Sequence, residues 1–73
     1  MTIEEQIATE LIERTKRNES SCYAGRIEGD GWWFTVSALV YDNDIAPVWY
    51  ECSDNTVKFD EIRRIYRAKC KQK

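Results

Sequence analysis

The chain has 73 residues, of which 33% are charged, and its formal net charge is −2. This length provides for one small domain, whose single core supplies a net stability of only roughly 3–5 kcal/mol. The sequence contains no histidine and three widely spaced cysteines, which excludes a Cys/His zinc site and the Ser-His and Cys-His pairs of nucleophilic catalysis. We therefore expect reduced structural thiols, no metal or other cofactor, and no enzymatic activity.

The apolar runs are far shorter than the ~20 residues of a membrane-spanning helix, and the N-terminus lacks the pattern of a signal peptide. These features predict a complete cytoplasmic protein with neither a membrane partner nor a small-molecule substrate. The charge is unevenly distributed, since residues 31–57 carry four acids and no base, whereas residues 58–73 carry two acids and seven bases. The middle of the chain is thus acidic and aromatic, and its end is basic.

The first predicted element is a helix that follows Thr2 and stops within residues 18–21. Thr2 and Glu5 have the spacing of a capping box, in which the two side chains satisfy the first amide groups of a helix. Apolar side chains recur at helical spacing and form one stripe along this helix. The stripe consists of Ile3, Ile7, Ala8, Leu11 and Ile12 and ends at Thr15.

Three strands are predicted after this helix. Residues 22–28 and 32–41 alternate as strands, and the tight turn Gly29-Asp30-Gly31 joins them as an antiparallel hairpin. A second turn over residues 42–44 leads to a third strand over residues 48–52. Pro47 marks the start of that strand near a sheet edge, because proline has no N–H to donate to a β-ladder.

Two interpretations fit the segment that follows. Residues 56–59 could form a short fourth strand, after which Asp60 would cap a helix with the apolar stripe Ile62, Ile65 and Tyr66. The spacing of three and four residues favours the helix. The basic residues 69–73 are expected to fray as a C-terminal tail, which leaves residues 1–68 as the single domain.

Together these elements predict an α+β fold. An N-terminal helix packs on an antiparallel three- or four-stranded meander, and a C-terminal amphipathic helix follows the sheet. The alternative is an SH3- or Sm-like barrel with an N-terminal helix, which would require residues 56–67 to be extended.

The two adjacent tryptophans, Trp32 and Trp33, cannot both enter the core, because successive side chains of a strand point to opposite faces. By this alternation one face is almost wholly apolar. It comprises Tyr23, Gly25, Ile27, Trp32, Phe34, Val36, Ala38, Val40, Val48, Tyr50 and Cys52. The other face is mixed and comprises Ala24, Arg26, Glu28, Trp33, Thr35, Ser37, Leu39, Tyr41, Trp49 and Glu51. The stripe of the N-terminal helix belongs on the apolar face.

The position of the second helix decides what the mixed face does. A three-stranded sheet is about 15 Å wide, and two helices of ~10 Å diameter would overhang it. The second helix therefore shares the apolar face, lies against an edge, or covers the mixed face. In the last case Trp33 and Trp49 belong to the core. In the other two they form an exposed aromatic patch of the kind that marks an interaction site.

The candidate functional residues are partner-binding residues in two groups. The first group supplies aromatic and arginine anchors of the types that dominate interface energetics, and it consists of Trp33, Trp49, Tyr41 and Arg26. The second group is electrostatic and consists of Arg63, Arg64, Arg67 and Lys69. We identify no catalytic, metal-binding or cofactor-binding residue.

Gly-Trp-Trp-Phe at residues 31–34 and Pro-Val-Trp-Tyr-Glu at residues 47–51 place the tryptophans in a sheet that follows a capped helix. This build, in an acidic and histidine-free chain of 73 residues, resembles the small regulators that bacteriophages make against host machinery. It is most similar to phage proteins that bind and inhibit bacterial RNA polymerase, and anti-CRISPR proteins are the neighbouring class. The resemblance implies a stoichiometric inhibitor in the host cytoplasm, which occludes a surface or displaces a partner such as the sigma factor.

Two further functions stay open from the residues alone. The basic C-terminal segment could bind nucleic acid through phosphates, although the acidic strands would repel phosphates from the aromatic side chains. The sheet edges could also pair with another copy and make the protein an oligomerising module.

Overall fold

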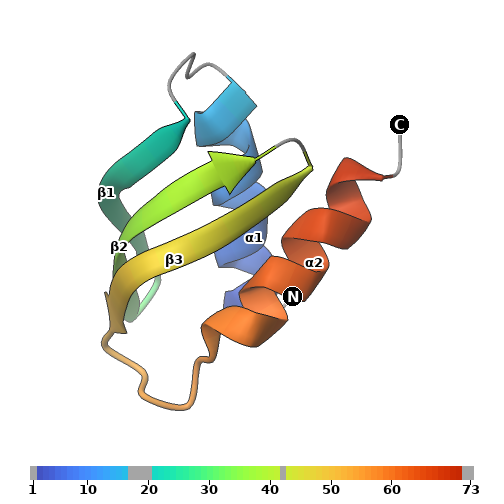
Figure 1. Cartoon of the computed structure of the whole chain (residues 1–73). Helices are drawn as coiled ribbons and strands as arrows, with labels where there is room; N and C mark the ends of the chain where they lie inside the picture. Colours follow the sequence, from blue (N-terminus) through green and yellow to red (C-terminus); the bar gives the residue numbers. More distant parts are fainter. Residues whose placement is uncertain (1, 17–20, 42, 72–73) are drawn as a thin grey trace.

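A computed structural model of the protein describes residues 2–16, 21–41 and 43–71. The elements along the chain are α1 (Ile3–Lys16), β1 (Cys22–Gly29), β2 (Trp32–Tyr41), β3 (Asp44–Cys52) and α2 (Phe59–Cys70) (Figure 1). The strands form one antiparallel sheet in the order β1-β2-β3. The predicted α+β arrangement of helix, meander and helix is confirmed.

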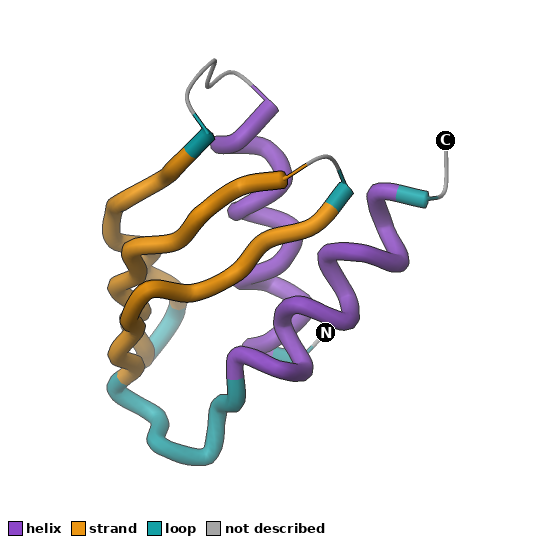
Figure 2. Tube along the Cα trace, in the orientation of Figure 1, coloured by secondary structure: helices purple, strands orange, loops and turns teal. Residues whose placement is uncertain are grey.

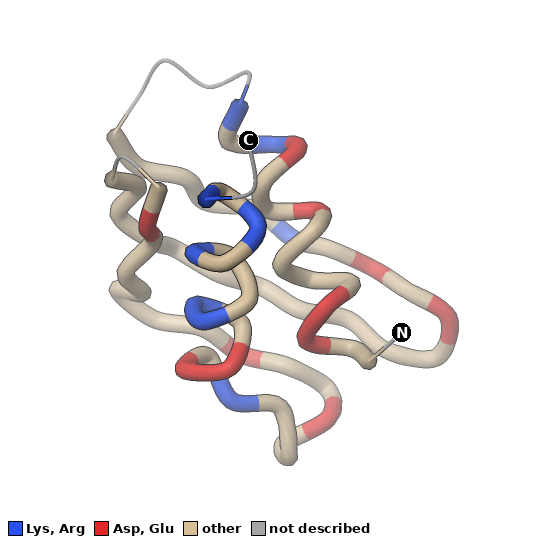
Figure 3. Tube along the Cα trace, turned by 90° about the vertical axis from the view of Figure 1, so that its right-hand side faces the viewer, with Lys and Arg blue, Asp and Glu red and all other residues tan. Residues whose placement is uncertain are grey.

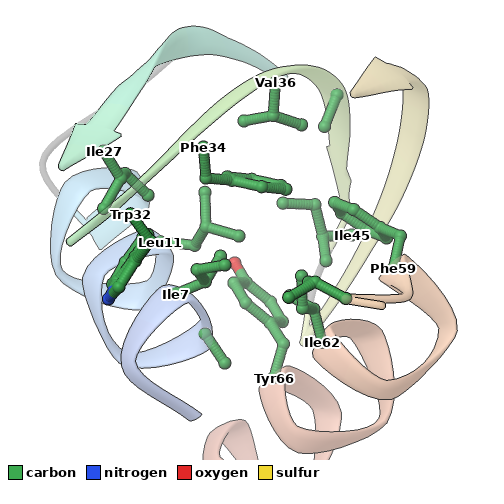
Figure 4. Close-up of a cluster of buried hydrophobic side chains, with 13 residues drawn as sticks. Ile7, Leu11, Ile27, Trp32, Phe34, Val36, Ile45, Phe59, Ile62 and Tyr66 are labelled. Atoms are coloured by element: carbon green, nitrogen blue, oxygen red, sulfur yellow. The ribbon is translucent and has the colours of Figure 1, made fainter. Parts of the chain in front are cut away.

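Both helices lie on the same side of the sheet, so the molecule has two layers (Figure 2). α1 packs against α2 and β1, and α2 packs against α1 and β3. The core between the layers contains thirteen buried side chains, most of which Figure 4 labels. They are Ile7, Ala8, Leu11, Ile27, Trp32, Phe34, Val36, Ala38, Ile45, Val57, Phe59, Ile62 and Tyr66. Within the described residues, no element covers the opposite face of the sheet.

The start of α1 has one bond of the predicted capping box, and in place of the second the Glu5 carboxylate meets the Thr2 hydroxyl instead of a backbone amide. The Glu5 N–H donates to Thr2 Oγ1 at 3.1 Å, and the Thr2 hydroxyl donates to Glu5 Oε1 at 3.3 Å. The helix ends at Lys16. Most of the predicted stop over residues 18–21 lies outside the described residues.

The first hairpin turns on two residues, Asp30 and Gly31, because Gly29 pairs directly with Trp32. Gly31 has φ +82°, a left-handed conformation that glycine adopts without steric cost. At Gly29 a Cβ atom would lie 2.1 Å from an atom of the Trp32 ring. The glycine therefore gives the Trp32 indole room to lie flat over the end of the hairpin and close the core.

β3 begins earlier than predicted, at Asp44 instead of Val48. Asn43, with φ +63°, forms part of a short turn that allows pairing to start at once; Asp42 lies outside the described residues. Pro47 is tolerated inside the strand because β3 is an edge strand. The register shifts beside Pro47, so that Val48 has no partner on β2. This β-bulge turns the Val48 side chain outward, 64% exposed, and its predicted place on the apolar face is wrong.

The segment after β3 contains no fourth strand, and α2 spans Phe59–Cys70. The barrel alternative is therefore wrong: Phe59, Ile62 and Tyr66, three and four residues apart, enter the core only as one face of a helix. Asp60 is not the N-cap but lies in the first turn, and Lys58 at the N-cap makes no side-chain capping bond. The predicted tail over residues 69–73 also starts too early, because α2 continues to Cys70.

An ion pair joins the start of β3 to α2. Asp44 accepts hydrogen bonds from Arg63 Nε at 2.9 Å and Arg63 Nη2 at 2.8 Å, and Arg67 Nε lies 3.9 Å from the same carboxylate. The Arg63 hydrogen bonds lower the pKa of Asp44 from 3.8 to about 2, although partial burial opposes this. The carboxylate is therefore charged in the fold at a pH where the unfolded chain would protonate it.

We expect Asp44 to contribute to stability in a defined pH range. Because its pKa is lower in the folded state, the stabilisation is complete well above pH 4 and is lost as the pH falls toward 2. Asp44→Asn should lower the urea midpoint at pH 7 and abolish this part of the acid-induced loss. Urea titrations between pH 7 and 2 would check it: the two midpoints should converge near pH 2, and a constant difference would contradict the ion pair.

Candidate protein-binding surface

The uncovered side of the sheet, here called the open face, carries the mixed set of side chains that strand alternation predicts. Its members are Cys22, Ala24, Arg26, Glu28, Trp33, Thr35, Ser37, Leu39, Tyr41, Ala46, Trp49 and Glu51. The second helix shares the apolar side of the sheet instead of covering this face. The structure therefore leaves the open face to solvent in the described part of the chain.

One half of the open face is apolar. The register aligns Leu39 with Cys22 and Ala46, and it aligns Trp49 with Ala24 and Ser37. Leu39 is 43% exposed and Trp49 is 52% exposed. The side chains between these two are small, so Leu39 and Trp49 project from the sheet. Two large apolar groups on a low surface are the arrangement that a partner's side chains can pack against.

The other half of the open face is charged, and it contains Trp33. Arg26 stacks on the Trp33 ring with its guanidinium carbon 4.8 Å from the ring centroid, and its Nε donates to Glu28 at 2.9 Å. This cation–π contact holds the indole partly covered. Glu51, one strand beyond Thr35, is exposed and forms no ion pair in the described residues. The two tryptophans of this face thus differ, because Trp49 projects and Trp33 lies under a cation.

A second apolar surface, here called the apolar edge, adjoins the open face along β3. It consists of Pro47, Val48 and Tyr50, all exposed. Tyr50 lies on the core side, 5.3 Å from the Phe59 ring, but remains 38% exposed at the rim. Sequence alternation missed Val48 and Tyr50 as surface residues. Pro47 was the available signal for the bulge, because proline within a sheet is confined to edge strands, strand starts and bulges. A bulge interrupts the alternation of side chains.

Neither sheet edge offers an unobstructed strand. The bond from Val40 N–H to Ser21 O fixes the pairing so that the Arg26 carbonyl points away from β2. Arg14 of α1 donates to that carbonyl at 3.4 Å. On β3, Pro47 lacks a donor and Val48 forms the bulge. Both devices discourage pairing with another strand, so the face is better suited to docking than the edges.

The basic residues of the predicted site lie elsewhere. Arg63, Arg64, Arg67 and Lys69 all belong to α2, in the helix layer, where Figure 3 shows the cations along successive turns. Arg63 is engaged with Asp44, and Arg64 pairs with Glu61 on the same helix. The eight predicted residues therefore do not form one surface. Arg26, Trp33 and Trp49 lie together, and the four basic residues lie on the other layer.

Tyr41 lies between the two groups. It is 53% exposed at the end of β2 and, with Lys69, lines a hollow of about 500 Å³ between the helices and the sheet end. The hydroxyls of Thr15 and Tyr66 meet there at 2.9 Å, and burial raises the Tyr66 pKa. This hollow brings together one aromatic and one basic residue of the predicted site.

The described residues include no group of three or more His, Cys, Asp or Glu side chains that could hold a metal ion. Neither α1 nor α2, the helices of the described part, has the length and apolar character needed to cross a membrane. No protein-family model, curated protein or solved structure matches the chain.

The structure predicts that two of the tryptophans contribute very differently to stability. Trp49→Ala should change the free energy of unfolding by no more than about 1 kcal/mol, because the side chain is mostly in solvent. Trp32→Ala should cost about 3–5 kcal/mol, since its indole closes the core, and this is enough to unfold a domain of this size. Far-ultraviolet circular dichroism and urea titration of both variants would check this. Unfolding of Trp49→Ala would show that its indole is a structural side chain.

Proposed function

We propose that this protein is a non-enzymatic, protein-binding regulator that docks onto its partner through the open face and the apolar edge. The observation that carries the proposal is the grouping of exposed large apolar side chains. Among the described residues, the exposed large apolar side chains are Leu39, Tyr41, Val48, Trp49 and Tyr50. They fall within twelve consecutive positions on two adjacent strands.

This grouping is costly for a small protein that has no partner. Exposed apolar area contributes nothing to folding and promotes aggregation. A chain that buries thirteen side chains in its core while leaving Trp49 on the open face therefore has a use for that side chain. Tryptophan and tyrosine at the centre of a patch with a polar rim are typical of interface anchors.

The proposal extends to the class of partner. The resemblance to phage regulators indicates a bacterial host protein, with RNA polymerase as the first candidate and the CRISPR machinery as the second. Binding would act by occlusion or displacement in the host cytoplasm. This mode of action requires a rigid surface and no chemistry, and a β-sheet with helices packed on one side provides such a surface.

Nucleic acid is the weaker candidate partner on geometric grounds. Arg63 and Arg64 each pair with a carboxylate, so part of the positive charge of α2 is neutralised within the molecule. The aromatic side chains that could stack bases lie on the other layer, beside Glu28 and Glu51. Phosphates would therefore meet cations and aromatic rings on opposite sides of the protein.

Binding to purified bacterial RNA polymerase, as core enzyme and as holoenzyme, tests the proposed partner. We expect Trp49→Ala to weaken binding by at least about tenfold, as removal of an anchor does, and Trp33→Ala to weaken it as well. Glu13→Ala, an exposed change on α1, is the matched control and should bind as the unmodified protein does. Biolayer interferometry measures these four proteins and Arg64→Ala, which should also bind as the unmodified protein does.

Three results would contradict parts of this proposal. Binding that tolerates Trp49→Ala and Trp33→Ala but is lost in Arg64→Ala would transfer the site to α2. Absence of binding to either form of the polymerase would remove this enzyme as the partner. Tight, steeply salt-dependent binding to a single-stranded oligonucleotide would favour the nucleic-acid function instead.

A further inference from the structure

We infer that the occupant of the open face is an amphipathic helix of the partner, with basic side chains at the end that meets Glu51 and Glu28. This inference rests on the proposed function and names the chemistry of the partner segment. It follows from the backbone requirements of the occupant, from the dimensions of the face and from its charges.

Whatever covers the open face must satisfy its own backbone hydrogen-bonding groups. The hydrogen-bonding groups of a sheet lie in its plane, so the open face offers only side chains to a segment above it. An extended segment lying there would bury its own N–H and C=O groups without partners, which costs free energy. Two features discourage pairing at the edges. Arg14 of α1 bonds the Arg26 carbonyl on the β1 edge, and the β3 edge contains Pro47 and the Val48 bulge. A helix is the smallest element that satisfies its own backbone.

The size of the open face also favours a single helix. The open face is about 15 Å wide and, over eight residues, about 27 Å long. Its flat area of about 400 Å² is roughly half of what each partner contributes to a standard stable interface. A second copy meeting this one face to face would thus have too little area. One helix of ~10 Å diameter that runs along the strands fits within the width of the face. The rest of the partner can extend over the apolar edge to Val48.

The charges of the open face favour a basic partner segment. The open face carries one base, Arg26, and two acids, Glu28 and Glu51. Arg26 is already engaged by Glu28 and stacked on Trp33. Asp30, in the adjoining hairpin turn, is exposed at the same end of the sheet. A lysine or arginine of the partner would pair with Glu51 there, whereas an acidic segment would be repelled. The half around Leu39 and Trp49 takes the apolar stripe of the helix.

Synthetic helical peptides of about 18 residues, roughly five turns, test this inference with the full chain. One peptide has a leucine stripe with lysines at one end, and a second has glutamates in place of the lysines. A third is a scramble of the lysine peptide that has no stripe. Calorimetry measures the affinities, and the emission of Trp49 and Trp33 reports whether the open face is occupied.

We expect the lysine peptide to bind more tightly than the glutamate peptide, and the scramble not to bind. Glu51→Lys should reduce this preference by about threefold to fivefold or more, the size of surface charge effects. Glu13→Lys makes the same charge change on α1 and should leave the preference unchanged. Trp49→Ala should weaken the binding of both striped peptides.

The outcomes separate this inference from the proposed function. If neither striped peptide binds, or the scramble binds equally, the helical occupant is wrong, while the polymerase experiment above still decides whether the open face binds protein. If both striped peptides bind equally, or Glu51→Lys and Glu13→Lys act alike, the basic character is wrong. If Trp49→Ala leaves the affinity of the striped peptides unchanged, the peptides occupy another surface and the inference is overturned.

Discussion

The whole arrangement depends on the packing of two helices against one face of a narrow sheet. Phe34, at the centre of β2, is fully buried between the layers and lies near the rings of Tyr50 and Phe59. α1 brings Ile7 and Leu11 to this centre, and α2 brings Ile62 and Tyr66 (Figure 4). Since both helices bury their apolar stripes here, neither is available to cover the other side. The open face is therefore a direct consequence of how the core is filled.

A three-stranded sheet is narrower than two helices side by side, and α2 accordingly lies at the β3 edge of the sheet. α2 packs against α1 and β3, and the ion pair of Arg63 with Asp44 joins it to the start of β3. The same strand is bent by the Val48 bulge and interrupted by Pro47. One strand thus packs against the second helix on its inner side, presents Trp49 on its outer side and carries the apolar edge along its free side. Structural and proposed functional roles therefore meet in β3.

Charge is also unevenly distributed over the molecule. The outer surface of α2 is basic, whereas the open face and its hairpin turn are acidic. α1, in the same layer as α2, carries four glutamates against Arg14 and Lys16, so the basic charge of this layer is confined to α2. A basic helix and an acidic sheet face on opposite sides give a protein a preferred orientation in the field of a charged partner. The cation–π contact of Arg26 with Trp33 keeps the one base of the open face close to the sheet. The projecting groups of that face are then apolar or acidic.

The sequence by itself determined the main elements, because their patterns are local. The spacing of Thr2 and Glu5 placed the start of α1, alternation gave the bounds of β2 and sent Trp32 and Trp33 to opposite faces, and the stripe of Ile62, Ile65 and Tyr66 favoured a helix over a fourth strand. Only the tertiary structure decided which side of the sheet α2 occupies, because an amphipathic stripe specifies that one face is buried but not against what. It also decided that the basic residues of α2 and the tryptophans lie on different layers. The early start of β3 and the outward turn of Val48 were equally beyond local pattern, since they depend on pairing with β2 across a bulge.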